Sequence, residues 1–184
     1  MKTFALLPLL VLAAAPALAQ QLQAAGSEIA FTSKQMGVPV DGRFRKFDAQ
    51  LAFDPKKPEA AKIAFTVDLA SVSFGSTEVE TEVVKPDWFD TKKFPQASFQ
   101  SSSVKAAGPG KFEVAGKLTI KGASQGVVVP VTLAQAGATT TASGAFTLKR
   151  LDYRIGDGDW KDTSMVANDV QVRFKLALSG VAPL

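Results

Sequence analysis

The sequence contains neither cysteine nor histidine, and these two absences exclude several kinds of chemistry. Without cysteine the chain has no disulfide, no thiol nucleophile and no ligand for an iron–sulfur cluster. Without histidine it lacks the usual general base near neutral pH and the usual ligand for zinc, copper or haem. We therefore expect a protein that is not an enzyme and that carries no metal and no cofactor.

Charge of one sign is not concentrated anywhere in the chain. The 21 basic and 17 acidic residues give a formal net charge of +4, and the two signs alternate along the sequence. Nucleic-acid binding proteins instead gather their positive charge on one face or along one helix. We therefore expect no nucleic-acid partner.

The N-terminal segment has the features of a secretory signal peptide. Lys2 precedes an apolar run, Phe4–Ala15, and Ala17 and Ala19 place small residues where a signal peptidase cleaves. The run is shorter than the roughly 20 residues that a membrane-spanning helix needs. We predict that residues 1–19 are a signal peptide cleaved after Ala19, that residues 20–184 form one domain, and that this domain is periplasmic.

Apolar residues recur at every second position over most of the mature chain. In the clearest run, Val170, Val172, Phe174, Leu176 and Leu178 alternate with polar or small residues. This period is typical of strands with one buried face. About eight such runs, beginning near residues 28, 44, 62, 99, 112, 127, 139 and 170, predict an all-β, antiparallel sandwich or barrel.

One insertion, between residues 71 and 94, breaks the alternation. Thr77–Glu80 resembles a capping box at the start of a short helix, and Pro86 ends that helix. The insertion is apolar enough to serve as a lid across a barrel mouth. Its apolar residues are Val79, Val83, Trp88, Phe89 and Phe94.

Phenylalanine dominates the predicted inward faces, with 13 in the whole chain. The interior of an eight-stranded barrel is either filled by its own side chains or holds one small ligand. Aromatic walls are frequent in ligand pockets, but an apolar face is first of all a core face. The pattern by itself leaves both interpretations open.

Two polar groups of residues have competing interpretations. Gly156–Asp162 superficially resembles a calcium loop, but it lacks the glycine and glutamate such a loop requires, so we predict a hairpin turn there. Arg43, Arg150 and Arg154 lie at predicted strand ends. They are either solvated or positioned to meet an anionic head group at a cavity mouth.

Several motifs, taken together and in order, resemble those of the YceI-like family. They are Ser27–Phe31, the Met36–Phe47 segment with Gly42 and Phe44, Phe53–Pro55, Val67–Asp68, Trp88–Asp90 through Phe99, Gly116–Gly122 and Arg150–Tyr153. The resemblance implies an eight-stranded, lipocalin-like antiparallel barrel with a short helical insertion. It also implies an elongated apolar cavity that holds a polyisoprenoid, such as a polyprenyl phosphate or the tail of a quinone.

The resemblance also bears on partners. Many relatives carry a histidine shortly after the first strand, whereas here the segment reads Ser33–Met36. In this respect the chain is similar to the branch that occurs with b-type membrane cytochromes. The alternative hypothesis is therefore a non-catalytic interaction module that binds such a cytochrome and carries no lipid. A homodimer is a further alternative that the sequence leaves open.

The resulting hypothesis is a periplasmic protein that sequesters or carries an isoprenoid lipid or isoprenoid quinone. We expect Arg43, Arg150 or Arg154 to contact its head group. We expect the ligand-binding wall to consist of Phe31, Phe44, Phe65, Trp88, Phe89, Phe94, Phe99, Leu118, Phe146 and Phe174.

Overall fold

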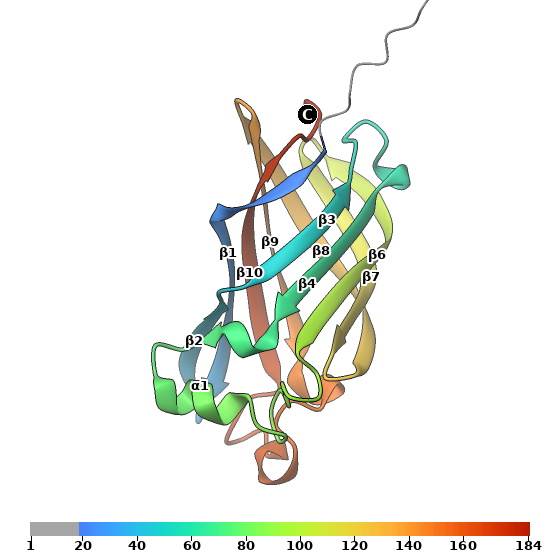
Figure 1. The fold of residues 1–184 in the computed structure, drawn as a ribbon. Helices are drawn as coiled ribbons and strands as arrows, with labels where there is room; N and C mark the ends of the chain where they lie inside the picture. Colours follow the sequence, from blue (N-terminus) through green and yellow to red (C-terminus); the bar gives the residue numbers. More distant parts are fainter. Residues whose placement is uncertain (1–18) are drawn as a thin grey trace, which may run out of the picture.

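The computed structural model describes residues 19–184, so the predicted signal peptide lies outside the described residues except for Ala19. The described chain forms one antiparallel sheet, one α-helix and four 3₁₀ turns (Figure 1). The strands are β1 (Gln21–Gln35), β2 (Val38–Phe44), β3 (Phe47–Ala52), β4 (Lys62–Asp68), β5 (Val72–Ser73), β6 (Gln96–Gly108), β7 (Lys111–Ile120), β8 (Ala123–Ala136), β9 (Thr139–Lys149) and β10 (Asp169–Ser179). The helix is α1 (Thr77–Val83), and the 3₁₀ turns are η1 (Pro58–Ala60), η2 (Leu69–Ser71), η3 (Arg150–Tyr153) and η4 (Gly158–Lys161).

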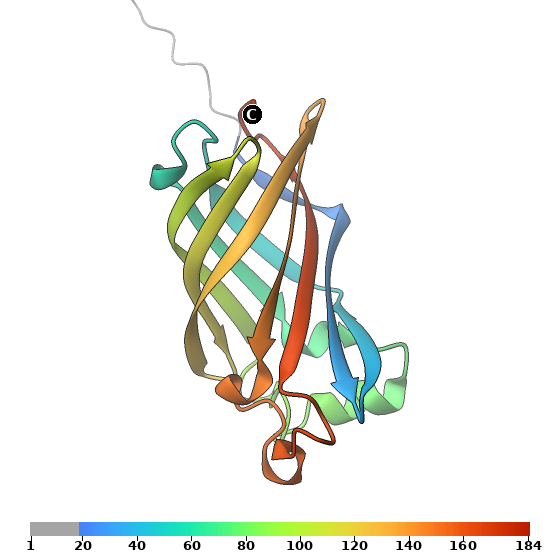
Figure 2. The same ribbon diagram turned by 180° about the vertical axis from the view of Figure 1, so that it is seen from behind.

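The sheet is elongated and curls around its long axis (Figures 1 and 2). Its strand order is β3-β4-β6-β7-β8-β9-β10-β1-β2-β5, and every neighbouring pair is antiparallel. Two residues, Arg45 and Lys46, connect β2 directly to β3. Because β3 is one edge of the sheet and β2 lies beside the other, this short connection requires the two edges to come together.

The all-β, antiparallel, lipocalin-like fold is confirmed, although the number of strands is ten and not eight. The two additional strands are β2 and β5. Strand β2 contains Pro39, Asp41 and Gly42, which interrupt the apolar alternation. Strand β5 has two residues, too few for any periodic pattern.

Helix α1 lies across the end of the sheet, next to the β1–β2 turn (Figures 1 and 2). The prediction of a helix here is confirmed, but the predicted capping box is wrong. The N-cap residue is Ser76, and its side chain makes no capping hydrogen bond. Glu80 reaches back beyond the helix, where its Oε1 accepts hydrogen bonds from the backbone N–H groups of Phe74 (2.9 Å) and Gly75 (3.2 Å).

The connection between β9 and β10 lies at the same end of the molecule as α1 (Figure 1). The hairpin turn predicted at Gly156–Asp162 is wrong. That segment belongs to a longer excursion between Lys149 and Asp169, which contains η3 and η4. No helix within residues 19–184 is both long enough and apolar enough to span a membrane.

Candidate ligand-binding cavity

The curled sheet encloses an apolar cavity of about 310 Å³, within the range typical of small-molecule sites. The wall combines the inward faces of strands from the whole sheet with side chains from the β5–β6 and β9–β10 connections. Its only polar lining residues in the described chain are Gln20, Ser33, Ser98 and Arg150. Strand alternation explains this composition, because successive side chains point to opposite faces of a sheet.

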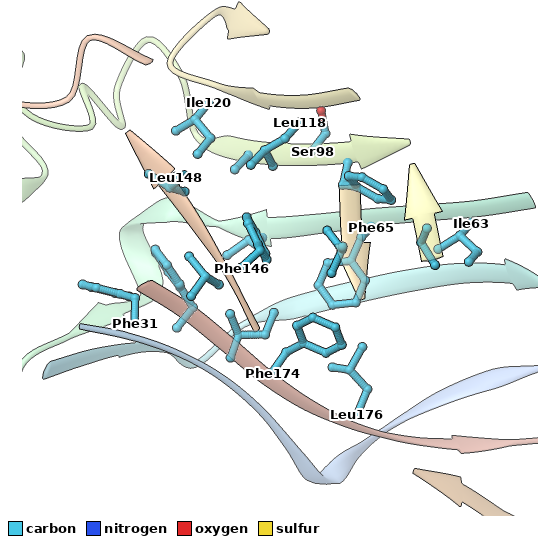
Figure 3. A pocket seen from close by; sticks show the side chains of 18 of the residues that line it. Phe31, Ile63, Phe65, Ser98, Leu118, Ile120, Phe146, Leu148, Phe174 and Leu176 are labelled. Atoms are coloured by element: carbon cyan, nitrogen blue, oxygen red, sulfur yellow. The ribbon is translucent and has the colours of Figure 1, made fainter. Parts of the chain in front are cut away.

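The structure places nine of the ten predicted wall residues along this cavity. Figure 3 shows Phe65 of β4, Phe146 of β9 and Phe174 of β10 facing the same space from three strands. The nine are Phe31, Phe44, Phe65, Trp88, Phe89, Phe99, Leu118, Phe146 and Phe174. That they contact a ligand stays a prediction.

Phe94 is the exception, and its assignment to the cavity wall is wrong. The left-handed conformation of Asp90 (φ 50°) turns the chain, and the Phe94 N–H bonds back to the Asp90 carbonyl at 2.8 Å. The ring therefore packs on the β7–β8 turn, where a Cβ at Gly122 would lie 2.9 Å from it. The Lys93 ammonium lies 5.3 Å from the ring centroid.

Three wall phenylalanines lie over glycines of neighbouring strands. A Cβ added to any of these glycines would lie 2.3–2.6 Å from the ring Cζ, so each ring occupies the place of a missing side chain. The rings consequently lie against the sheet and take less of the lumen than projecting rings would. The pairs are Phe31 over Gly42, Phe99 over Gly116 and Phe174 over Gly144.

The two ends of the cavity differ in composition. The hairpin end, which carries the β6–β7 and β8–β9 turns, is packed with a mainly aliphatic cluster around Val104, Val114 and Leu133. The α1 end, where α1 and the β9–β10 connection lie, is rich in aromatic rings. Ring centroids there are separated by 5.5 Å (Phe31–Phe44), 5.4 Å (Phe31–Phe74), 6.1 Å (Phe44–Phe89) and 5.2 Å (Trp88–Trp160).

Arg150 is buried at the α1 end, with 2 % of its surface exposed. Its five N–H groups donate to five backbone carbonyls of the β9–β10 connection. Nε bonds Ala167 at 3.1 Å, Nη1 bonds Ile155 and Gly156 at 2.8 and 3.2 Å, and Nη2 bonds Trp160 and Val166 at 2.6 and 2.7 Å. Burial lowers the pKa of Arg150, because desolvation disfavours the charged guanidinium.

The prediction that Arg43, Arg150 or Arg154 contacts a head group is wrong, because none of the three presents a free N–H group to the cavity. Arg150 lines the cavity but has no N–H group left to offer a ligand. Arg43 is exposed on the outer face of β2, because its neighbours Gly42 and Phe44 face inward. Arg154 is also exposed and does not line the cavity, and its carbonyl accepts a hydrogen bond from Lys121 Nζ at 2.7 Å.

Sequence reasoning missed other aromatic residues of the wall. Phe53 and Phe112 pack edge to face at 5.2 Å near the hairpin end, and both lie on the inward period of their runs. Both belong to runs that the alternation identifies, so assigning every inward phenylalanine of those runs to the wall would have included them. Phe74 follows the two-residue strand β5, which is too short to give a periodic pattern, so the sequence does not indicate that Phe74 faces inward.

The cavity is suited to binding an apolar molecule. Its wall holds a single ionisable group, the Arg150 guanidinium, so the described lining provides no acid–base pair for proton transfer. Within residues 19–184, no cluster of three or more carboxylates is placed to hold a metal ion. An antiparallel sheet curled around an apolar cavity is the architecture of lipocalin-like proteins.

Within that class, a model of the YceI-like domain matches residues 20–178, and the chain belongs to the YceI-like family. Among solved structures it is similar to Burkholderia cenocepacia BcnA, with 47% identity and a TM-score of 0.82 over 85% of this chain and 98% of that one. A polyisoprenoid binding domain from Saccharophagus degradans shares the fold at 18% identity, with a TM-score of 0.71 over 90% of this chain and 99% of that one.

Curated relatives match over shorter segments. Protein YceI of Escherichia coli O6:H1 is 39% identical over 92 residues, which are 50% of this chain and 46% of that protein. A UPF0312 protein of Ectopseudomonas mendocina is 35% identical over 88 residues, 48% of this chain and 46% of that protein. The chain thus spans about half the length of the curated relatives it matches.

Proposed function

We propose that the protein binds an isoprenoid chain, either a polyisoprenoid or the tail of an isoprenoid quinone, and carries or sequesters it in the periplasm. The observation that carries this proposal is the apolar cavity of about 310 Å³ that runs between the hairpin end and the α1 end. A periplasmic location is supported by the signal-peptide features of residues 1–19.

The energetics of burial favour a flexible apolar chain as ligand. Burial contributes about 0.8 kcal/mol per CH₂, so an isoprene unit of five carbons contributes roughly 3–4 kcal/mol before entropic costs. A few units therefore offset the cost of ordering the chain. With so few polar groups in the wall, selection should depend mainly on the girth and length of the ligand.

The family supports the same ligand class. The Saccharophagus degradans protein of the same fold is described as a polyisoprenoid binding domain. The two proteins share one fold, and the cavity wall of this chain is apolar apart from Gln20, Ser33, Ser98 and Arg150. An isoprenoid chain fits both the description of that protein and the apolar wall of this one.

Native mass spectrometry of protein purified from its own periplasm tests the proposal. We expect a stoichiometric adduct, and lipid analysis of an organic extract should identify it as a prenyl chain. A bare polypeptide mass that stays bare after incubation with quinones and polyprenols would contradict lipid binding. Co-purification of a lipid-free protein with a b-type cytochrome would favour the interaction module instead.

A charge in the middle of the cavity should abolish uptake. Phe65 lies there, paired with Phe99 across β4 and β6, and Phe65→Asp would place a carboxylate in an apolar wall. We expect loss of lipid uptake with a retained β-sheet signal in circular dichroism. Gln100→Asp is the matched control, because Gln100 is exposed on the outer face next to Phe99. Normal uptake by folded Phe65→Asp would remove Phe65 from the binding wall.

A further inference from the structure

The two methionines of the described chain lie at the α1 end of the molecule and are both open to solvent. The chain has three methionines and no cysteine, and Met1 lies outside the described residues. Met36 is 72 % exposed and Met165 is 44 % exposed. Neither residue lines the cavity. Their thioethers are therefore the sulfur atoms that solvent reaches within residues 19–184.

Backbone pairing places these two methionines opposite each other. The Met36 N–H donates to the Met165 carbonyl at 2.8 Å, and the preceding residue, Gln35, forms an antiparallel bridge with Val166. Directly opposite residues of an antiparallel pair are close enough for their side chains to interact. The two methionines, one from the β1–β2 turn and one from the β9–β10 connection, thus form a single surface site.

Met36 occupies a position that neither packing nor turn chemistry explains. It forms the two-residue turn between β1 and β2 together with Gly37, and both have positive φ, 48° and 80°. Asparagine, aspartate or glycine is usual at the first position of such a turn, and a bulky side chain with positive φ is strained. An exposed methionine also gains little from burial of its apolar surface. The property that remains is the chemistry of its thioether.

In a chain without cysteine, the exposed thioether is the softest nucleophile that an oxidant meets. Hydrogen peroxide converts it to a sulfoxide: a lone pair of the sulfur attacks one peroxide oxygen, the S–O bond forms and the O–O bond breaks. The other oxygen leaves as water after proton transfer, so the sulfur loses an electron pair and the peroxide gains it. A methionine sulfoxide reductase reverses the change, since the sulfoxide oxygen leaves as water and a dithiol becomes a disulfide.

The position of the pair determines what oxidation does to the protein. A sulfoxide is polar, and within a core it disrupts packing. At Met36 and Met165 the new S–O groups lie in water, so no unsatisfied polar group is buried. Val166, the next residue along the chain, is 6 % exposed and lines the cavity. The core therefore begins one residue away from the pair and includes neither thioether.

We propose that Met36 and Met165 form a surface site for reversible oxidation by hydroperoxides. Both thioethers become sulfoxides, while the fold and the apolar cavity stay unchanged. The oxidant is hydrogen peroxide or a small organic hydroperoxide, and the reductant is a dithiol acting through a methionine sulfoxide reductase. The site does not depend on the ligand of the cavity, since neither methionine lines it.

Peptide mapping by mass spectrometry, after treatment of the folded protein with hydrogen peroxide, tests the site. We expect one added oxygen atom on Met36 and one on Met165, at rates within about threefold of each other. Leu69→Met is the matched control, because a volume-conserving change places a thioether where the chain is 1 % exposed. That buried methionine should react at least roughly tenfold more slowly. Equal rates at all three positions, or oxidation of a tryptophan before either methionine, would overturn the proposal.

Repair and tolerance are measured on the oxidised protein. Methionine sulfoxide reductases A and B with dithiothreitol should restore the original mass of the folded chain, because both side chains are accessible. The urea midpoint and the lipid uptake should equal those of the untreated protein. The double variant that combines Met36→Leu and Met165→Leu is the control and should gain no oxygen under the same treatment.

Each failure contradicts a different part of the proposal. Sulfoxides that the reductases cannot remove from the folded chain would contradict reversibility. A lower urea midpoint after oxidation would mean that a thioether contributes to packing, and lower lipid uptake at an unchanged midpoint would place the pair on the path of the ligand. The mapping, repair and unfolding measurements use no lipid, so they decide this proposal even if the protein binds no isoprenoid and the proposed function fails.

Discussion

Glycines on the inward face shape the cavity as much as the phenylalanines do. A phenylalanine that projects from a strand fills the lumen, whereas one that lies over a glycine of the next strand leaves space. Gly42, Gly116 and Gly144 all have a phenylalanine ring where their side chain would be. These glycines lie on β2, β7 and β9, so the same arrangement, a phenylalanine ring over a glycine of the next strand, occurs at three places around the lumen.

Gly42→Ala should push a ring into the cavity. The three atoms nearest to the new Cβ all belong to Phe31, at 2.3–2.9 Å, so the ring must move. We expect the free energy of unfolding in urea to fall by about 1–3 kcal/mol, as for other overpacked cores, and lipid uptake to decrease. In the control, Gly126→Ala, no atom lies within 4 Å of the new Cβ. If Gly42→Ala keeps wild-type lipid uptake and stability, the Phe31 ring can move aside without entering the cavity, and the prediction is wrong.

Arg150 shows how one residue can organise an irregular segment. Its planar guanidinium satisfies five carbonyls at once, which a lysine ammonium cannot do. Arg150→Lys should therefore leave several buried carbonyls unpaired and reduce the free energy of unfolding by about 3–5 kcal/mol. Arg154→Lys is the control, because Arg154 is exposed and its side chain makes no hydrogen bond or ion pair in the described chain. Equal stability of the two variants would contradict this role.

At the scale of elements, α1 is joined to the sheet through Glu80. Its Oε1 accepts from the Phe74 and Gly75 N–H groups and from the Ser73 hydroxyl, while Arg45 lies 4.0 Å away. The hydrogen bonds from Phe74 and Ser73 are the main causes that hold the pKa of Glu80 below its usual value. A carboxyl whose pKa is lowered on folding stabilises the protein above its unfolded pKa, and this contribution is lost as the pH falls through the folded pKa.

The junction should therefore weaken in acid. We expect Glu80→Gln to be less stable than the wild type at pH 7, and the difference to shrink as the pH falls below about 4, near the unfolded pKa. Urea unfolding of both proteins at a series of pH values measures this difference in the free energy of unfolding. Glu78→Gln, an exposed position of α1, is the control and should show no such trend. A difference that stays constant down to pH 3 would show that the charge of Glu80 is not involved.

The sequence predicts long strands well and short or irregular elements poorly. In β7, β8 and β10 one face is buried along most of the strand, so the alternation is continuous and predicts both the strand and its inward residues. In β2, Gly42 is an inward residue without a side chain, and it therefore gives no apolar signal. The same glycine leaves room for the Phe31 ring, so this position helps to shape the wall and yet gives no apolar signal in the sequence.

The irregular end of the cavity could not be predicted, because its contacts depend on backbone carbonyls. The acceptors of Arg150 come from residues 155 to 167, and no spacing of side chains in the sequence marks them. Phe94 was misplaced for a related reason, since the conformation of Asp90 (φ 50°) decides which way the chain turns. Such backbone choices follow from tertiary packing and not from local periodicity.

For the whole molecule, the sheet brings the first and last strands of the described chain side by side. The first strand, β1, pairs with the last, β10, and β2 continues into β3 at the opposite edge. Along Gln21–Gln23, β1 pairs with β10 but not with β2. Near this region, Gln20, which directly precedes β1, bonds Phe53, which directly follows β3: its side-chain amide donates to the Phe53 carbonyl and accepts from the Phe53 N–H at 2.9 Å.

Gln20→Ala should loosen this closure without changing the cavity wall elsewhere. Loss of two hydrogen bonds should reduce the free energy of unfolding by about 1–2 kcal/mol, which corresponds to a fall in melting temperature of roughly 2–8 °C. Because Gln20 lies where β1 and β3 meet and lines the cavity, bound lipid should also dissociate faster. Differential scanning calorimetry and stopped-flow release of a fluorescent lipid measure the two effects. The control is Gln50→Ala, at an exposed position of β3, which should change neither the melting temperature nor the rate of lipid release. If Gln20→Ala lowers the melting temperature but leaves lipid release unchanged, the ligand leaves the cavity by a route away from this junction.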